Sequence, residues 1–511
     1  MRNPWAPRVN YASLSSQGTS QQRSLPDFAI LVVSFLALLS GHLLLREYMP
    51  NPALGVVGFL LIAGLLGWVL LIRNDTYAFV MIVYVCSHFS FADNQGGLWA
   101  LMAAILIGAH FAMGMRRESF HRRDLVVTGA LCIFLLWNVM GWVLRNPVPF
   151  VERLQGAIAF CGFLMVFYLI SNMTITPARL RTFLAITFVI FVYQFAVALN
   201  QRYSFLDWNT PLLGAYDRGS AAIVLGDTSA PGTLRHSELF GEYGALFWSL
   251  LIPVLCSSWI QKELRFGPAR IAAIMLLCLA FIAITSTRSA ALLAAATVAF
   301  YIAMLLTISF RSIDRFRRQV LLGILLAMIV PIVGIYVGLG TLEQDMVAFM
   351  REKLTTEGVI SGAALNRGNL FEIALNRLSE KSWWIGNGFG TPRANLWAWT
   401  GLDPLRARTI ADYHNLYLSL PFLYGWIGSA SFLWLVVSTA WRSARAAVVN
   451  RHRQTFLVPV AIGFATLWGV FLVDQFKISV LRIPTYHMMF WIWLGLTLAV
   501  VRTLTVQARS S

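Results

Sequence analysis

Residues 319–340, QVLLGILLAMIVPIVGIYVGLG, contain no acidic or basic side chain. A helix needs about 20 apolar residues to cross the hydrocarbon core of a bilayer, so this stretch predicts a membrane-spanning helix. Similar stretches lie near 28–45, 53–72, 76–92, 97–115, 125–144, 155–171, 180–199, 239–258, 270–286, 289–309, 414–438, 456–473 and 484–501. We therefore expect about 14 transmembrane helices, with about 12 as the lower bound.

The composition of the chain also indicates an integral membrane protein. Of its 511 residues, 58% are hydrophobic and 12% are charged, whereas soluble proteins contain about 25% charged residues. The alternating pattern of a β-barrel is absent, so helices must satisfy the backbone hydrogen bonds within the bilayer. The predicted fold class is all-α, a polytopic membrane protein whose obligatory partner is the lipid bilayer.

The net charge of +17 is explained by membrane topology. Basic clusters lie at 116–123, 311–318 and 442–453, and the positive-inside rule assigns these connections to the cytoplasm. Nucleic acid is therefore not expected as a partner. Both termini are then cytoplasmic, and the two long loops, 200–238 and 341–413, lie on the outer face of the membrane.

These assignments divide the chain into six parts. We expect a disordered cytoplasmic tail (1–26), N-terminal transmembrane helices (27–199), an outer loop (200–238), central transmembrane helices (239–340), a large outer loop with short helices that is expected to carry the function (341–413), and C-terminal transmembrane helices with a short cytoplasmic tail (414–511). The first apolar stretch has no small-residue cleavage site after it, which favours a retained helix over a signal peptide.

Cysteines and most histidines are interpreted as packing residues. The five cysteines all lie in apolar stretches and show neither a disulfide framework nor zinc spacing: Cys86, Cys132, Cys161, Cys256 and Cys278. Four histidines lie in or beside apolar stretches, where a hydrogen-bonded packing role is favoured over a ligand role: His42, His88, His110 and His487. We expect neither a metal nor a cofactor.

The large loop 341–413 has its own local pattern. Apolar residues at helical spacing over 366–378 predict a helix with Asn366 as N-cap, which puts Arg367 in the first turn, where anions are favoured. Gly386, Gly388 and Gly390 indicate a turn that would permit hinge motion, not a nucleotide-binding fingerprint. For the loop's four tryptophans an interfacial belt is favoured over sugar-stacking platforms: Trp383, Trp384, Trp397 and Trp399.

Four cationic or titratable residues fall where predicted helices meet the outer face: Arg235, Arg288, Arg367 and His414. Three guanidinium groups beside a histidine are costly unless an anion is bound there. The planar fork of arginine suits phosphate oxygens, so a lipid-linked diphosphate is the natural substrate at this depth. An interfacial salt bridge for Arg235 and snorkelling to headgroups for Arg288 stay open as structural alternatives.

The same residues carry a family resemblance. Arg235 to Leu239 is an Arg-x3-Leu element, and His414 to Gly425 is a His-x10-Gly element. Two further stretches accompany them, Thr285-Ser286-Thr287-Arg288 and Arg367 with Trp384-Ile385-Gly386-Asn387-Gly388. In their order and spacing over about 200–440, these elements resemble the O-antigen ligase and polymerase superfamily of bacterial membrane proteins. The N-terminal half shares only its hydrophobicity with that family.

The resemblance implies a GT-C-like, metal-independent, inverting glycosyltransferase that uses undecaprenyl-diphosphate glycans. By position, Arg235 and Arg288 would hold the diphosphate with help from Arg367, and His414 would contact or activate the acceptor hydroxyl. Three neighbours stay open as base, as substrate contacts or as orienting partners of His414: Glu238, Asp412 and His236. The early outer loops lack the Asp-x-Asp or Glu-x-Asp pair of metal-dependent C-type enzymes, which favours arginine over metal.

The acceptor is not legible in the sequence. A ligase would attach the glycan to a lipid A core, whereas a polymerase would join O-antigen or exopolysaccharide repeat units, and either would work beside further polysaccharide-assembly proteins. We favour the ligase-like interpretation, with the polymerase as the alternative. A lipid-glycan flippase is least favoured, because charged residues within the apolar stretches are scarce and no matching halves are evident.

Overall fold

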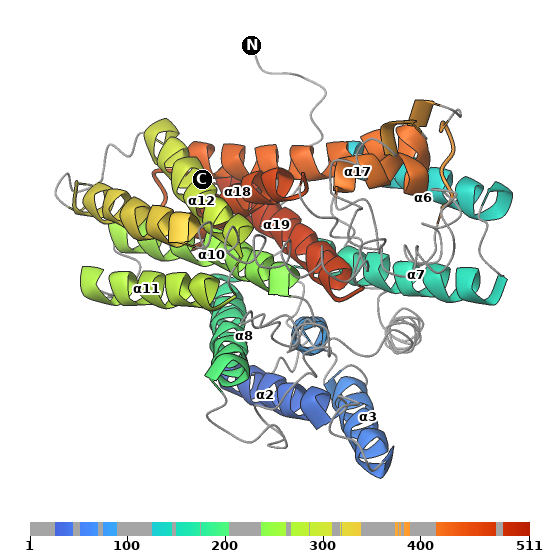
Figure 1. The fold of residues 1–511 in the computed structure, drawn as a ribbon, viewed down its shortest axis with the longest axis horizontal. Helices are drawn as coiled ribbons and strands as arrows, with labels where there is room; N and C mark the ends of the chain where they lie inside the picture. The colour runs from blue at the N-terminus through green and yellow to red at the C-terminus, as the bar shows by residue number, and fades with distance from the viewer. Residues whose placement is uncertain are drawn as a thin grey trace, which may run out of the picture.

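The computed structural model describes a helical protein in which no strand occurs among the described residues. These residues are 26–43, 52–69, 75–88, 125–145, 150–173, 175–203, 237–261, 267–285, 287–308, 317, 319–338, 374–376, 378–379, 383–388, 415–476 and 484–510. The N-terminal helices are α2 (Asp27–Leu43), α3 (Pro52–Gly67), α4 (Thr76–Cys86), α6 (Leu125–Leu144), α7 (Phe150–Asn172) and α8 (Pro177–Tyr203). The later helices are α10 (Ser237–Ile260), α11 (Pro268–Ile284), α12 (Arg288–Thr307), α17 (Leu416–Val449), α18 (Leu457–Asp474) and α19 (Pro484–Ser510), with one more over Gln319–Gly338 (Figure 1).

These helices coincide with the apolar stretches of the sequence. Each expected span overlaps a helix except 97–115, which lies outside the described residues. Among the described helices, 8 are long and apolar enough to cross a membrane, and α2, α4, α7 and α11 contribute shorter apolar segments. The chain is therefore a helical, multi-pass membrane protein by length and composition, and the total of about 14 spans stays a prediction.

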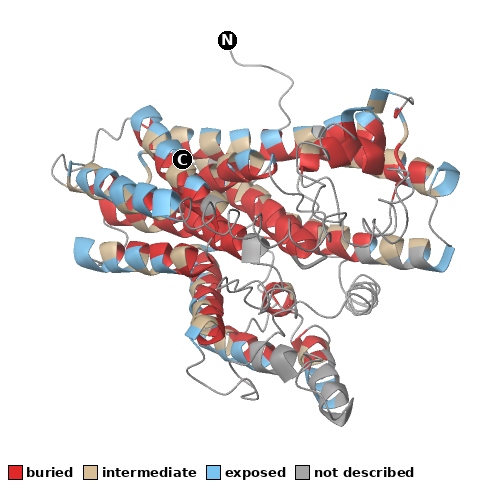
Figure 2. Cartoon of the chain, in the orientation of Figure 1, coloured by how far each residue is buried: buried red, intermediate tan, exposed pale blue. Residues whose placement is uncertain are grey.

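Helix α10 forms the centre of the C-terminal bundle. From Phe240 to Ile260 every residue except Leu255 is buried (Figure 2). The helix packs on α18, α12 and α11, and it is hydrophobic around its whole circumference, as a helix enclosed by others must be. Any polar side chain on α10 between Phe240 and Ile260 is therefore enclosed by the protein.

A second set of helices packs around α17 and α19, and the outer surface of the bundle is apolar. Helix α17 packs on α6 and α18, and α19 packs on α7. Large apolar side chains remain exposed on outer faces, including Val330 on the helix Gln319–Gly338 and Trp441 on α17. Apolar surface of this extent is unfavourable in water and is the normal exterior of a protein in a bilayer.

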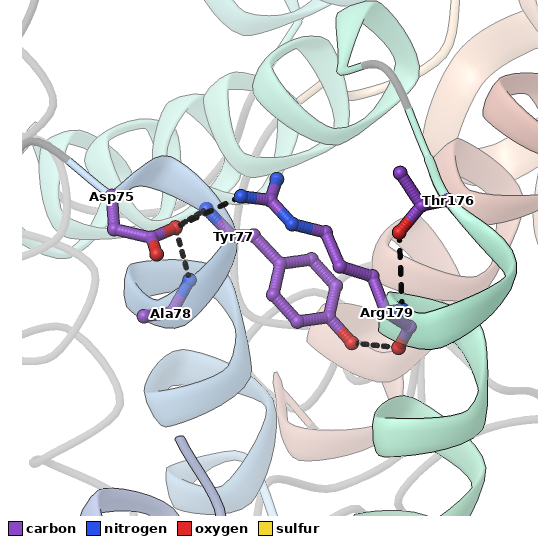
Figure 3. Close-up of polar contacts among 5 residues, drawn as sticks. All are labelled: Asp75, Tyr77, Ala78, Thr176 and Arg179. Atoms are coloured by element: carbon purple, nitrogen blue, oxygen red, sulfur yellow. Dashed lines mark hydrogen bonds and ion pairs between the residues drawn. The ribbon is translucent and has the colours of Figure 1, made fainter. Parts of the chain in front are cut away.

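An acidic residue at the start of α4 illustrates how this fold stabilises a buried charge. Asp75 caps α4 by accepting hydrogen bonds from the main-chain N–H groups of Tyr77 and Ala78, each at 3.1 Å. It also forms an ion pair with Arg179 of α8, with 3.8 Å between Oδ1 and Nη2. The Arg179 guanidinium lies 5.1 Å from the centre of the Tyr77 ring, and the Tyr77 hydroxyl donates to the Arg179 carbonyl (Figure 3).

Several sequence expectations need correction. Helix α8 continues to Tyr203, into the expected loop 200–238, and α17 and α19 run past the expected spans to Val449 and Ser510. Arginine and alanine favour helix, so the basic segment after residue 438 does not end α17.

Cys86, Cys256 and Cys278 are buried as expected, but Cys132 and Cys161 are exposed and are not core residues. His88 Nδ1 donates to the Tyr84 carbonyl at 2.7 Å and the side chain is 1% exposed, which confirms its packing role.

Candidate functional site

The predicted site residues divide into two groups. Arg288 is the first residue of α12 and Glu238 is the second residue of α10; their main chains are described, but their side chains are not. Arg235, His236, Arg367, Asp412 and His414 lie outside the described residues. The site is therefore built from the described helix ends that adjoin these positions.

The start of α10 lies against the turn that carries Arg288. A Cβ atom placed on Gly241 would lie 1.9 Å from Thr287 Oγ1 and 2.9 Å from Thr285 Oγ1, so only glycine allows this approach. Thr285 Oγ1 donates to the Ile282 carbonyl at 2.7 Å and lies 3.2 Å from Thr287 Oγ1. The two threonine hydroxyls thus fix the short connection between α11 and α12.

Glu242, next to Gly241, places a carboxylate at this junction. Its side chain is 1% exposed, and its Oε1 accepts a hydrogen bond from Ser289 Oγ at 3.2 Å. Ser289 is the residue that follows Arg288 at the start of α12. A helix N-terminus favours a nearby anion, because its first N–H groups carry partial positive charge. Ionisable residues inside membrane segments are rare and usually functional.

A second buried carboxylate ends α18. Asp474 is 3% exposed and accepts a hydrogen bond from Gln475 Nε2 at 3.0 Å. The Gln475 carbonyl accepts from the Leu416 N–H at 2.9 Å, and the Asn415 side chain donates to the Phe476 carbonyl at 2.9 Å. The end of α18 therefore meets the start of α17, directly after His414 in the chain.

Tyr486 of α19 is 5% exposed and lies beside Tyr243, the residue after Glu242, with the two ring centres 6.2 Å apart. We define Glu242, Ser289, Asp474 and Tyr486 as the carboxylate cluster. The Glu242–Ser289 hydrogen bond joins α10 to the start of α12, and Gln475, which donates to Asp474, joins the end of α18 to the start of α17.

A second structural feature joins the segment 383–388 to α6 and α17. Helix α17 is interrupted at Gly425, whose φ of 68° and ψ of 172° are accessible in practice only to glycine. A Cβ atom on Gly425 would lie 2.3 Å from the Trp384 carbonyl oxygen, and one on Gly386 would lie 2.4 Å from the Gly425 nitrogen. Gly388 has a φ of 75°, and a Cβ atom on it would lie 2.2 Å from the Trp142 nitrogen. A Cβ atom on Gly141 would lie 2.4 Å from the Gly386 carbonyl oxygen. We call Gly141, Gly386, Gly388 and Gly425 the glycine lock.

Main-chain hydrogen bonds close the glycine lock. The N–H groups of Asn387 and Gly388 donate to the carbonyls of Phe422 and Leu423 at 2.8 and 2.7 Å. The Trp426 N–H donates to the Trp383 carbonyl at 2.8 Å. Interruption of a helix leaves N–H and C=O groups without intrahelical partners, and the segment 383–388 supplies partners to them.

Trp137 of α6 and Arg145, the residue that follows α6, complete this contact. Trp137 Nε1 donates to the Trp384 carbonyl and Arg145 Nη1 to the Ile385 carbonyl, each at 2.8 Å. The Trp383 ring packs edge-on against Phe422, with ring centres 4.6 Å apart, and is 8% exposed. Trp383 is therefore a packing residue and not part of an exposed aromatic belt, whereas Trp384 is exposed. Trp397 and Trp399 lie outside the described residues.

The glycines of this segment have a different role from the one expected. Gly386 and Gly388 allow main chains to approach closely, and their tight packing opposes hinge motion at these two positions; Gly390 lies outside the described residues. Gly425, the last residue of the His-x10-Gly element, contacts the Trp384 to Gly388 element directly. Two elements far apart in sequence therefore meet in the fold.

Comparison with known proteins gives no family assignment. A scan against protein-family models finds no matching family, and a search of curated proteins finds no significant match.

Three residues of this region escaped the sequence analysis: Glu242, Asp474 and Gly141. Glu242 and Asp474 sit within or at the end of apolar stretches, and their acidic character there was the available signal. Gly141 is a single glycine in an apolar helix, and no local pattern distinguishes it from Gly129, around which there is open space. Among the described residues, no group of three or more His, Cys, Asp or Glu side chains could hold a metal ion.

Proposed function

We propose that this protein is a glycosyltransferase of the O-antigen ligase type. It transfers a glycan from undecaprenyl diphosphate to an acceptor hydroxyl at the periplasmic face of the inner membrane. The observation that carries the proposal is the pairing of its motif segments. The Thr285–Arg288 element lies against the start of α10, whose first three residues end the Arg-x3-Leu element, and Gly425 lies against Trp384 and Gly386.

The described helix ends also support binding of an anion. Helices α10 and α12 begin side by side at Gly241, Thr287 and Ser289. Each helix N-terminus carries partial positive charge, and Arg288 adds a full charge in the first turn of α12. A diphosphate brings two adjacent phosphate groups, and arginine binds such oxygens through two parallel hydrogen bonds. Its lipid chain would remain in the bilayer, beside the helices.

The chemistry requires charge stabilisation and removal of one proton. The acceptor oxygen attacks the anomeric carbon as the bond from that carbon to the diphosphate oxygen breaks. Undecaprenyl diphosphate leaves, and Arg235, Arg288 and Arg367 would stabilise its negative charge. His414 would take the proton of the acceptor hydroxyl, because the reference pKa of histidine suits a base at neutral pH.

Arg288→Ala tests the diphosphate role. We expect loss of transfer by about 100-fold or more, because a positioned cation is removed from the developing charge. The measurement is a polysaccharide gel from a deletion strain complemented with wild type or variant, with protein level checked by blot. Arg317→Ala is the matched control: Arg317 donates to the Trp259 carbonyl at 2.9 Å, at the opposite end of α10.

The pattern of the gel also distinguishes the related activities. A ligase without Arg288 accumulates long lipid-linked glycan with none on the final acceptor. A polymerase without it leaves single repeat units. A flippase is distinguished by a separate measurement of the leaflet that holds the lipid-linked substrate, which would be the cytoplasmic one for a flippase and the periplasmic one for an enzyme. A normal ladder from well-expressed Arg288→Ala would overturn the diphosphate role and return Arg288 to a snorkelling function.

A further inference from the structure

Glu242 is a buried carboxylate that contacts the start of α12, and it belongs to none of the sequence elements of the family resemblance. It lies near the start of a helix that is buried from Phe240 onward, except at Leu255, and that carries no other charged side chain from there to Ile260. A carboxylate in such surroundings loses much of its hydration, which is costly unless polar partners compensate for it. An apolar residue would satisfy packing alone at this position at lower cost, so the presence of a carboxylate indicates a functional role.

The contacts of Glu242 point toward α12 and not toward solvent. Its Oε1 accepts from Ser289 Oγ at 3.2 Å, and Gly241 beside it is pressed against Thr287. Thr287 and Ser289 flank Arg288 in the chain. Glu242 therefore holds Ser289 while Gly241 meets Thr287, and the negative charge of Glu242 lies at the same helix end as the Arg288 main chain.

Helices α18 and α19 lie beside this arrangement. The ring centre of Tyr486 of α19 lies 6.2 Å from that of Tyr243, the residue after Glu242, and α18 packs on α10. At the end of α18, Asp474 adjoins Gln475, whose carbonyl accepts from the Leu416 N–H near the start of α17. Buried polar side chains thus lie at the start of the helix that bears Arg288 and at the start of the helix that follows His414.

We propose that Glu242 is a positioning residue that acts through Arg288, and this inference rests on the proposed function. Its carboxylate and its hydrogen bond to Ser289 fix the start of α12, so that Arg288 meets the diphosphate in one orientation. A bidentate arginine contact depends on such orientation, and displacement by about 1 Å costs up to about 100-fold in related settings. Burial at 1% exposure suits a positioning role better than direct proton transfer to an acceptor.

A double-mutant cycle tests this coupling directly. Equilibrium binding of undecaprenyl diphosphate is measured for purified protein in nanodiscs, for wild type, Glu242→Gln, Arg288→Ala and the double variant. We expect Glu242→Gln to weaken binding about 10-fold in wild type and to have no further effect once Arg288 is absent, because coupled residues are non-additive. Glu242→Asp keeps the charge and should restore part of the affinity.

Asp75→Asn is the matched control, because it neutralises a buried carboxylate that is bound by Arg179 at a separate site. It should leave binding unchanged. Wild-type binding by Glu242→Gln, or an equal loss in both backgrounds, overturns the inference while Arg288→Ala still weakens binding. Wild-type binding by Arg288→Ala instead overturns the proposed function. Thermal unfolding of each variant separates lost binding from lost folding.

Discussion

The glycine lock and the carboxylate cluster are both attached to the first ten residues of α17, but they differ in what holds them together. The glycine lock is made of main chain approaching main chain, with no room for a Cβ atom. The carboxylate cluster is made of polar side chains that a smaller apolar residue could replace sterically. At 1.5 Å per residue, about 15 Å of helix separates Asn415 from Gly425. Substitutions in the lock should therefore unfold the protein, whereas substitutions in the cluster should spare the fold and remove function.

Gly425→Ala should have the largest effect on stability. The new Cβ atom would meet the Trp384 carbonyl at 2.3 Å, in a backbone conformation that alanine avoids. We expect a loss of about 4 kcal/mol or more in the free energy of unfolding, which would leave little recoverable protein. Protein yield and thermal unfolding in detergent measure it.

Gly129→Ala provides the control for Gly425→Ala. Gly129 lies on α6, the helix that also carries Gly141, and a Cβ atom there would meet nothing within 4 Å. Alanine costs less conformational entropy than glycine in a helix, so this change should be neutral or stabilise by up to about 1 kcal/mol. Equal stability of the Gly425 and Gly129 variants would contradict the steric account of the lock.

Gly425 also illustrates what sequence alone could and could not predict. The spacing from His414 singled out this glycine, but its reason, contact with Trp384 and Gly386 some 40 residues earlier, depends on the folded chain. The helices themselves were predictable, because the bilayer forces apolar stretches of fixed length into helix. Helix ends were less so: Arg442 and Arg445 mark the expected edge of the membrane, yet they continue α17.

Glu242 was missed for a related physical reason. Its hydrogen-bond partner Ser289 lies 47 positions away in the chain, on another helix. Periodicity identifies the apolar stretch that contains Glu242 but says nothing of which neighbour satisfies its charge. Arg288 could be singled out, because it lies in a very short connection between two apolar stretches.

Asp75→Asn should have an intermediate effect and sharpens the comparison from outside the site. Asparagine is also a good N-cap, so the hydrogen bonds from Tyr77 and Ala78 survive while the ion pair with Arg179 is lost. Arg179 is partly exposed, so solvent weakens the pair, and we expect a loss of about 1 to 2 kcal/mol. Thermal unfolding measures this loss, and glycan transfer should remain at the wild-type level once protein amounts are matched. A large loss of transfer without a loss of stability would mean that Asp75 belongs to the functional cluster.

Trp137→Phe should have the smallest effect, since it removes one hydrogen bond from the glycine lock and keeps an aromatic ring. Trp137 Nε1 donates to the Trp384 carbonyl at 2.8 Å, and the lock keeps its main-chain hydrogen bonds without it. The expected loss is about 1 kcal/mol, seen as a small drop in the unfolding temperature. Trp434→Phe on the exposed face of α17 is the control and should change nothing measurable. If Trp137→Phe proved as damaging as Gly425→Ala, side chains of α6 and not main-chain contacts would hold the segment 383–388 in place.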